Sequence, residues 1–311
     1  TAEAGACSKC KAELVAAKFE GIDVIVPTHP VEVRAVAALR DAGALSGMAV
    51  TLPRTAVIEI ADDKAATQAR LAAAGVPVPA TLLLAEPADV ARAFARFAGD
   101  GSPVWVRGSG APGLGIGAAA LPCRDTGVAT AWVEHHSGGG KMAASEFLPG
   151  ANLSWMGAYA DGVLLAAGTR ERLEYVLPHV APSGVTGAPA VSRTVASPEV
   201  AAIGRAAVAA IDVRPHGVYF VDLKGDAAGG PRVTEINAGR CGTTVLAYEA
   251  AGFNFPWLLV RLARGEAVAP LPDPDAACRA GCYWVRTLDC GPVALADVRV
   301  FDRFPSAGFA P

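Results

Sequence analysis

The sequence lacks long hydrophobic runs, although hydrophobic residues make up 52% of its 311 positions. Arg, Asp, Gly or Pro interrupts each apolar stretch, so none reaches the roughly 20 apolar residues that a membrane-spanning helix needs. The first residues do not follow the pattern of a signal peptide. We therefore expect a protein without membrane contacts. The chain begins at Thr1, not at Met, and we expect further residues before it.

An excess of positive charge is also missing. Lys and Arg number 27 against 30 Asp and Glu, which gives a net charge of −3 and a pI near 6.0. Nonspecific nucleic-acid binding needs a basic surface, so we expect no nucleic-acid partner. With 18% charged residues the chain is expected to fold, and its length suffices for two or three domains.

Cysteine is too scarce and too scattered for a disulfide framework. The seven cysteines are odd in number, and a reducing cytoplasm is the expected location. Cys7 and Cys10 form a C-x-x-C pair, and Cys278 and Cys282 form a looser one. A shared zinc site is one interpretation, and ordinary thiols are the other.

The first of three predicted zones covers residues 1–60. It contains a helix at Lys11–Phe19, a short buried strand at Asp23–Pro27 and an amphipathic helix at Val31–Ala42. Strand, helix and strand in this order favour a parallel βαβ unit.

The second zone covers residues 61–143. Asp62 or Asp63 can cap a helix over Lys64–Ala74. Further along we expect a strand at Thr81–Leu84, a helix at Pro87–Phe97 and a strand at Pro103–Arg107. The glycine-rich run at 108–117 follows, and such a run predicts a mobile loop.

The third zone covers residues 144–311 and is dominated by strands. Strands are expected at Ala144–Phe147, Leu153–Tyr159, Val163–Gly168 and Gly281–Leu288, helices at Pro198–Ala210 and Pro256–Ala263, and a hairpin at Val218–Asn237.

This hairpin carries the strongest chemical signal. If it is symmetric about its turn, Asp222 lies directly opposite Glu235, and Asn237 shares a face with Glu235. Like charges in this position are unfavourable unless a cation compensates them, and oxygen ligands favour Mg²⁺. A solvated hairpin face is the alternative, because a one-residue slip of the register would undo the arrangement.

Two further features favour a phosphate site. Arg240 follows the hairpin in a turn that can bring its guanidinium beside a phosphate. Arg107 ends a strand and leads into the glycine-rich loop, whose backbone N–H groups can approach phosphate oxygens. No G-K-[ST] follows, so the loop is not a Walker loop.

Five motifs in order resemble the ATP-grasp superfamily, and within it the carbamoyl phosphate synthase-like branch. They are D-V-I-V-P-T from Asp23, the segment Asp63–Thr81, P-V-W-V-R-G-S-G-A-P-G-L-G-I-G from Pro103, S-E-F-L-P-G from Ser145, and E-I-N-A-G-R from Glu235. The resemblance covers about residues 23–262. It implies an α/β protein whose ATP-binding part is α+β: two lobes that grip ATP, preceded by a partial βαβ pre-ATP-grasp domain.

The resemblance also implies roles for individual residues. The residues implied to bind ATP are Lys64, Arg107, Ser109, Gly113, Gly115, Glu146, Phe147, Leu148 and Asn152. Asp222, Glu235 and Asn237 would hold Mg²⁺, with Mn²⁺ as the alternative ion. Arg240 would neutralise the γ-phosphate, and Arg170 and Arg172 would stabilise an acyl phosphate.

The sequence departs from the family pattern in four places, the first of which is that the family's first nucleotide-fold strand is not recognisable before Asp23. Asn152 stands nearest to the position of an acidic residue that often follows the hinge glycine. The metal motif has one more residue before its arginine, Arg240, and the phosphate strand carries Arg107 where many relatives have Lys.

The resemblance implies a ligase that joins a carboxylate to an amine, with small-molecule substrates and a chain that can form a homodimer. A carboxylate would attack the γ-phosphate of ATP, and an amine would then displace phosphate from the acyl phosphate. Two alternatives stay open: an enzyme that forms an acyl or carbamoyl phosphate for a partner, and a nucleotide-binding protein without catalysis.

Overall fold

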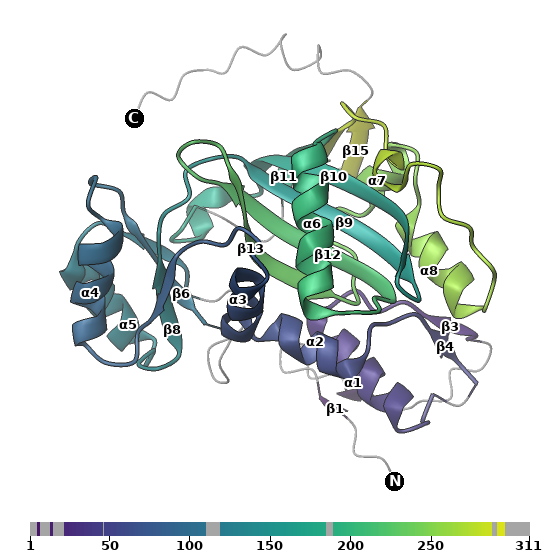
Figure 1. Cartoon of the computed structure of the whole chain (residues 1–311), viewed down its shortest axis with the longest axis horizontal. Coiled ribbons are helices and arrows are strands. Elements are labelled where there is room, and N and C mark those ends of the chain that lie inside the picture. The colour runs from purple at the N-terminus through teal and green to yellow at the C-terminus, as the bar shows by residue number, and fades with distance from the viewer. Residues whose placement is uncertain are drawn as a thin grey trace.

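Two antiparallel sheets, one of seven strands and one of four, dominate the structure (Figure 1). The structure is a computed structural model that describes residues 5–6, 13–14, 22–45, 47–109, 119–184, 189–287 and 291–295. The seven-stranded sheet, here the large sheet, has the order β13-β12-β9-β10-β11-β14-β15. Its strands are β9 (Asn152–Ala160), β10 (Val163–Tyr175), β11 (Pro189–Val195), β12 (Gly217–Gly225), β13 (Pro231–Ala238), β14 (Tyr283–Thr287) and β15 (Gly291–Leu295).

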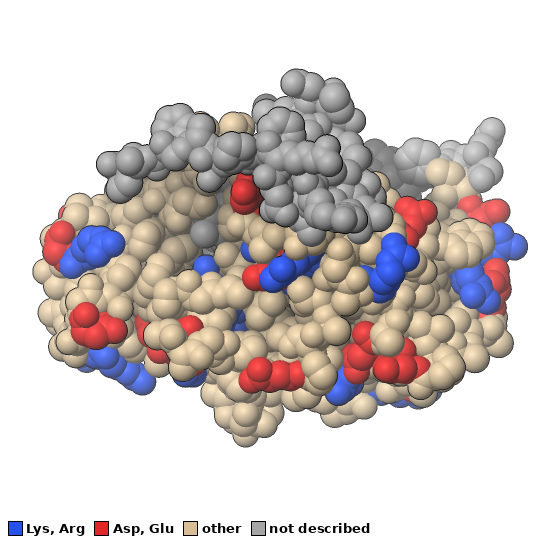
Figure 2. All heavy atoms as spheres, turned by 90° about the horizontal axis from the view of Figure 1, so that it is seen from above, with Lys and Arg blue, Asp and Glu red and all other residues tan. Residues whose placement is uncertain are grey.

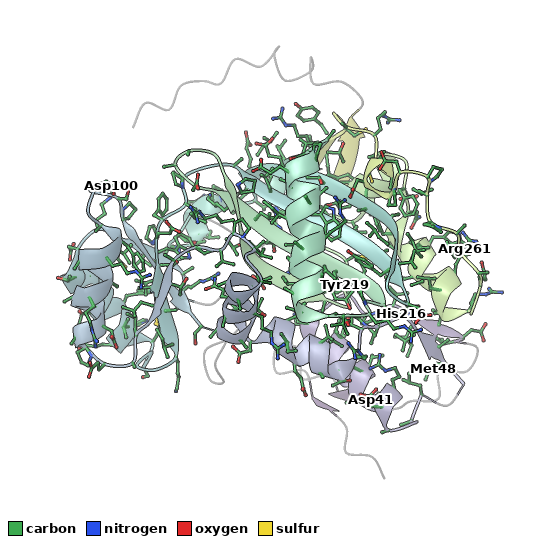
Figure 3. All side chains as sticks on the ribbon, in the orientation of Figure 1. Asp41, Met48, Asp100, His216, Tyr219 and Arg261 are labelled. Atoms are coloured by element: carbon green, nitrogen blue, oxygen red, sulfur yellow. The ribbon has the colours of Figure 1, made fainter. Side chains whose placement is uncertain are left out.

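The four-stranded sheet, here the small sheet, has the order β5-β8-β6-β7. It consists of β5 (Thr81–Leu83), β6 (Val104–Gly108), β7 (Leu121–Cys123) and β8 (Met142–Ser145). Two helices, α4 (Ala88–Phe97) and α5 (Thr126–His135), pack on it around a core that includes Val90, Val104 and Met142. Figure 3 shows Asp100 beside this unit, at the opposite end of the molecule from Arg261 on α8.

The N-terminal part contains the parallel unit that the sequence predicts. Strand β3 (Val24–Ile25) pairs in parallel with β4 (Ala49–Val50), and α1 (Pro30–Asp41) connects them. The predicted helix at Lys11–Phe19 is wrong at Glu13–Leu14, which form strand β2 and pair with β1 (Gly5–Ala6). Its remaining residues lie outside the described part of the chain.

Two consecutive helices lead from this unit to the small sheet. They are α2 (Thr55–Asp62), which the sequence reading did not identify, and α3 (Lys64–Ala73). Asp63 caps α3, because its side chain accepts a hydrogen bond from the backbone N–H of Ala66 at 2.9 Å. The cap fixes the first turn of α3 and therefore the position of Lys64.

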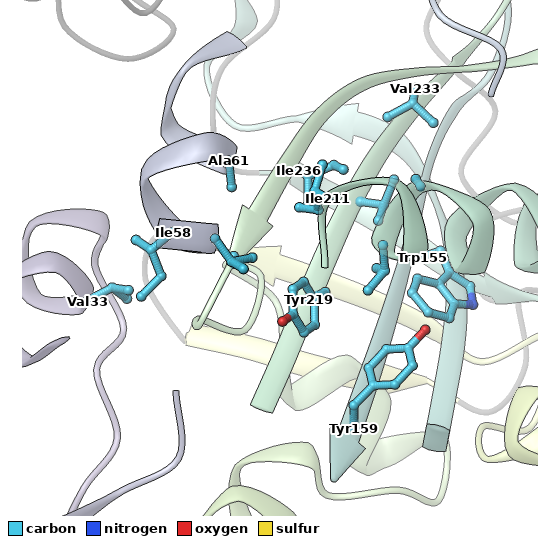
Figure 4. Packing of buried hydrophobic residues seen from close by; sticks show 14 of the residues in the cluster. Val33, Ile58, Ala61, Trp155, Tyr159, Ile211, Tyr219, Val233 and Ile236 are labelled. Carbon is cyan, nitrogen blue, oxygen red and sulfur yellow. The ribbon is translucent and has the colours of Figure 1, made fainter. Parts of the chain in front are cut away.

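One face of the large sheet is apolar and is covered by α6 (Pro198–Ile211), which crosses it in Figure 1. Trp155, Tyr159 and Tyr219 point from this face into a core that also contains Ile211 and Ile236 (Figure 4). The same core extends to Ile58 of α2, so the N-terminal helices and the large sheet share one apolar interior.

The opposite face of the large sheet is apolar at one end and polar at the other. At the apolar end, Met156 and Phe220 pack against α7 (Leu246–Ala250) and α8 (Phe255–Ala263). Two short 3₁₀ turns, Pro178–Val180 and Pro274–Ala276, complete the connections. At the polar end, the same strands carry serine, arginine, lysine and acidic side chains, among them Asp222 and Glu235.

Several elements differ from the sequence-based expectation. The strand expected at Val163–Gly168 continues to Tyr175, and β7, β11, β15 and α5 were not expected. Helix α5 has a recognisable start signal, because the side chain of Asp125 accepts from the backbone N–H of Val128 at 2.8 Å. The domain limits at 60/61 and 143/144 stay predictions.

A substitution at Gly204 tests how closely α6 packs on the large sheet. Alanine normally stabilises a helix relative to glycine by about 0.5–1 kcal/mol. Here a Cβ at Gly204 would lie 2.5 Å from Cδ2 of the Trp155 ring. We expect Gly204→Ala to lower the free energy of unfolding by about 1–2 kcal/mol, measured by urea denaturation. Gly99→Ala is the control, because nothing lies within 4 Å of its added Cβ. A stabilised Gly204→Ala variant would contradict this packing.

Candidate active site

The acidic hairpin has the register that the sequence predicts. Asp222 of β12 lies directly opposite Glu235 of β13, and Asn237 lies two residues beyond Glu235. The amide nitrogen of Asn237 is 3.5 Å from Oδ2 of Asp222. The register next to the turn, with Lys224 opposite Arg232, would place Asp222 opposite Thr234, and a bulge at Thr234 shifts it by one residue so that Asp222 faces Glu235. Two carboxylates and an amide therefore converge on one face of the sheet.

Asp222, Glu235 and Asn237 each contact a cationic side chain. Nζ of Lys64, whose side chain is 6% exposed, lies 3.3 Å from Oε2 of Glu235. Arg172 of β10 forms an ion pair and a hydrogen bond with Asp222. Arg240 donates a hydrogen bond to Oδ1 of Asn237. These contacts join α3, β10 and the turn after β13 to the hairpin.

The pKa shifts show how these charges oppose burial. Burial is the largest influence on Glu235 and raises its pKa, but the charges of Lys64 and Arg107 together hold that pKa below its usual value. Burial raises the pKa of Asp222, and the charge of Arg172 only partly opposes it. The pKa of Lys64 is lowered, mainly by burial. The site is therefore a dense set of interacting buried charges.

A cavity of about 790 Å³, part of it open to solvent, lies between the two sheets at this position. The small sheet and the connection after it contribute Trp105, Arg107, Ser145, Glu146, Phe147 and Leu148. The large sheet contributes Asn152, Arg172, Tyr175, Asp222, Lys224 and Glu235. A cavity with an apolar end and convergent polar groups is typical of small-molecule sites.

The apolar end lies where β8 leads into β9. The rings of Trp105 and Phe147 are 6.3 Å apart and tilted, and Leu148 is buried beside them. The Glu146 carboxylate accepts a hydrogen bond from the backbone N–H of Ala80 at 2.8 Å. The side chain of Glu146 therefore links the connection between β8 and β9 to the segment before β5 by a hydrogen bond.

The remaining predicted residues are distributed around the cavity. Ser109 lines a second hollow, on the α3 side of Arg107, together with Lys64. Arg170 is 0% exposed and lies below the cavity wall. Gly113 and Gly115 lie outside the described residues, as do Cys7 and Cys10. Cys278 and Cys282 are described, and both are free thiols.

Several lining residues were not assigned to the site from the sequence, among them Trp105, Tyr175 and Lys224. Trp105 lies two residues before Arg107 on β6, and Lys224 lies two residues after Asp222 on β12. Strand alternation places each on the same face as its neighbour and could have identified both. Tyr175 follows two register shifts at the end of β10, and alternation fails there.

The donor set fits a hard divalent cation. Carboxylate oxygens of Asp222 and Glu235 and the amide oxygen of Asn237 are ligands that Mg²⁺ accepts. No group of three His, Cys, Asp or Glu side chains suited to a metal occurs among the residues that the structure describes.

Charged side chains of both signs lie on the face of the molecule that Figure 2 shows. In Figure 2 acidic and basic side chains are interspersed over the coloured part of the face shown. Within the described ranges, no helix is long and apolar enough to cross a membrane.

Comparisons with known proteins define the class of fold. No protein-family model matches the sequence, and no curated protein matches it significantly. Solved structures do match. One is the biotin carboxylase domain dimer of Hydrogenobacter thermophilus 2-oxoglutarate carboxylase with MgADP, ADP and bicarbonate, at a TM-score of 0.63 and 17% identity. The match covers 85% of this chain and 58% of that chain.

Two other solved structures have different activities. Carboxyaminoimidazole ribonucleotide synthase from Aspergillus clavatus, complexed with ATP, matches at a TM-score of 0.62 and 15% identity, over 85% of this chain and 65% of that chain. The D-alanine-D-alanine ligase from Coxiella burnetii matches at 0.56 and 18% identity, over 78% and 68%. The present chain thus spans less than two thirds of the length of the first two neighbours.

These neighbours are ATP-grasp proteins. The protein therefore has the ATP-grasp fold, an α+β arrangement, and the expectation from the five motifs is confirmed at the level of fold.

The Lys64–Glu235 pair generates a pH-dependent prediction. A depressed pKa in the folded state means that Glu235 contributes stability above its unfolded pKa, which is lost as the pH falls through the folded value. Glu235→Gln should therefore lower the free energy of unfolding by about 1–3 kcal/mol near pH 7. The loss should shrink below about pH 4.

Urea denaturation of both proteins at about pH 7 and about pH 3.5 measures this difference. Glu134→Gln, on the exposed side of α5, is the matched control and should change stability little at either pH. An equal loss for Glu235→Gln at both pH values would contradict the charge pairing.

Proposed function

We propose that the chain is the catalytic part of an ATP-dependent ligase that activates a carboxylate as an acyl phosphate and transfers the acyl group to an amine. The observation that carries the proposal is the cavity between the two sheets. It has an apolar slot at one end and the Asp222–Glu235 pair with its surrounding cations at the other.

The apolar slot suits the adenine ring. Trp105, Phe147 and Leu148 supply apolar surface, and the backbone of the segment 146–148 supplies donors and acceptors for the ring edge. Because the Glu146 carboxylate is already bonded to Ala80, this residue would act through its backbone. Asn152 and Lys224 are cross-strand neighbours that line the next part of the cavity. We assign them to the ribose.

The acidic end suits the triphosphate. Mg²⁺, or Mn²⁺, would be held by Asp222, Glu235 and Asn237, and when bound it would neutralise charge on the phosphate oxygens. Lys64, Arg107 and Arg240 would supply the remaining positive charge around the phosphates. Ser109, Gly113 and Gly115 would belong to the loop that approaches the same oxygens.

The reaction needs no nucleophile from the protein. A substrate carboxylate oxygen forms a bond to the γ-phosphorus while the bond to the bridging oxygen breaks, which releases ADP. An amine then attacks the acyl carbon, phosphate leaves, and the amine loses a proton. Arg172, which lines the cavity beside Asp222, would orient the carboxylate and stabilise the acyl phosphate, with Arg170 behind it.

A second candidate is an enzyme that forms an acyl or carboxy phosphate and passes it to a partner. The bicarbonate named with the Hydrogenobacter thermophilus structure favours this candidate, because bicarbonate is itself a small acid with one carboxylate-like group. A homodimer stays a prediction for either candidate. A protein that has lost catalysis is less consistent with the intact set of Asp222, Glu235 and Asn237.

ADP release with a panel of carboxylates, with and without amines, separates the two candidates. For the ligase, we expect ADP release to depend on both substrates. For the acyl phosphate-forming enzyme, the acid alone should support it.

Within this assay, Asp222→Asn should lower kcat at least 100-fold, because one metal ligand and one counter-charge are lost. Asp226→Asn is the matched control on the same hairpin, since Asp226 caps the turn and pairs with Arg232. Full activity of Asp222→Asn, with normal binding of Mg·ATP, would show that the metal assignment is wrong.

A further inference from the structure

Two arginines of β10 share one aromatic ring on the polar face of the large sheet. Arg170 and Arg172 are two residues apart, so strand alternation places both on the face that carries Asp222. Their guanidinium carbons lie 5.5 Å and 5.8 Å from the centre of the Phe220 ring. Arg170 also lies 5.8 Å from the centre of the Tyr248 ring. The two cations are therefore close neighbours.

Very little negative charge compensates this pair. Asp222 bonds to Arg172, and its charge also raises the pKa of Arg170. Arg170 is fully buried, and none of its three guanidinium nitrogens has a hydrogen-bond partner. Burial and the neighbouring charge of Arg172 lower the pKa of Arg170 to about 10. Aromatic rings stabilise a cation only in part, so the pair carries an excess of buried positive charge.

If the chain has the proposed function, the excess of buried positive charge at Arg170 and Arg172 becomes larger. If Asp222 becomes a metal ligand, Arg172 loses its partner and Arg170 loses its nearest compensating charge. Two guanidinium groups then need two negative charges. The reacting carboxylate of a simple acid supplies one, and the phosphoryl group that it receives carries further negative charge beside Arg172. Arg170, which lies behind Arg172, still has no anionic partner of its own.

Resting on that function, we infer that the acid substrate carries a second anionic group, an oxyanion such as a carboxylate, and that the Arg170–Arg172 pair binds it. Arg172 and Tyr175 both line the cavity, and Arg170 lies buried behind Arg172, so the second anionic group contacts Arg172 while Arg170 adds its charge from below. Ser192, the cross-strand neighbour of Arg172, adds a buried hydroxyl without a hydrogen-bond partner in the described structure. The arrangement selects dicarboxylates over monocarboxylates of equal length.

The first test compares the binding and turnover of diacids with those of their monoamides, using the whole protein chain. Malonate, succinate, glutarate and adipate are each assayed against the corresponding monoamide, which keeps the length and removes one charge. Binding is measured by calorimetry on the chain saturated with Mg²⁺ and a non-hydrolysable ATP analogue, and turnover by ADP release. We expect at least one diacid to bind at least tenfold more tightly than its monoamide. Equal affinity throughout, or no diacid binding, overturns the inference.

The second test removes the buried charge. Arg170→Met keeps the apolar stem and deletes the guanidinium, so we expect an unchanged or raised Tm together with loss of the diacid preference. Arg193→Met is the matched control, because Arg193 lies on the neighbouring strand and pairs with Glu171 on the opposite face. It should keep the preference.

The outcomes separate this inference from the proposed function. A diacid preference that persists in Arg170→Met overturns the role of the arginine pair, while Mg·ATP binding and ADP release still support the ligase. Failure of the wild-type chain to bind Mg·ATP overturns both. If Arg170→Met does not fold, the comparison of diacids and monoamides on the wild-type chain decides the substrate class alone.

Discussion

The ion pair between Lys64 and Glu235 joins the helix that leads to the small sheet to the acidic hairpin of the large sheet. Lys64 is the first residue of α3, and Glu235 lies in the edge strand β13 of the large sheet. The pair fixes the helix that leads to the small sheet against the acidic hairpin. The width of the cavity between the sheets therefore depends on it. Arg107 adds a second link, since its guanidinium lies 3.4 Å from the carbonyl oxygen of Thr234 on the same strand.

A cluster of buried charges lowers stability unless every member is compensated. Removing one partner of such a cluster leaves an uncompensated charge, which is why single substitutions there are expected to be costly. The large apolar core on the other face of the sheet, with Trp155 and Tyr219 beneath α6, supplies the stability that the polar face lacks. Arg170 is fully buried without a hydrogen-bond partner, which is a local cost of the kind that proteins carry at functional sites.

Local signals in the sequence predicted much of the arrangement. The predicted pairing of Asp222 with Glu235 is correct, although a bulge at Thr234 and not the symmetry of the turn produces it, and Asp63 correctly marked the start of α3. The five motifs indicated the ATP-grasp fold, which the solved neighbours bear out. The assignments of individual site residues go beyond what the neighbours test and stay predictions.

Other features depend on tertiary structure and could not be predicted locally. Tyr175 reaches the cavity only because register shifts at the end of β10 change which face it occupies. The helical pattern of residues 11–19 did not decide the structure of Glu13–Leu14, because a strand partner at Gly5–Ala6 provides an alternative. The bond between the Glu146 carboxylate and Ala80 also joins distant segments, so the sequence alone could not show that this side chain is engaged.

A crystal structure of the chain with Mg²⁺ and a non-hydrolysable ATP analogue tests the central claim most directly. The account predicts the adenine ring between Phe147 and the large sheet. It also predicts a metal ion at about 2.0–2.2 Å from oxygens of Asp222 and Glu235. A nucleotide bound outside this cavity, or a metal ion held by other residues while Asp222 stays paired with Arg172, would contradict it.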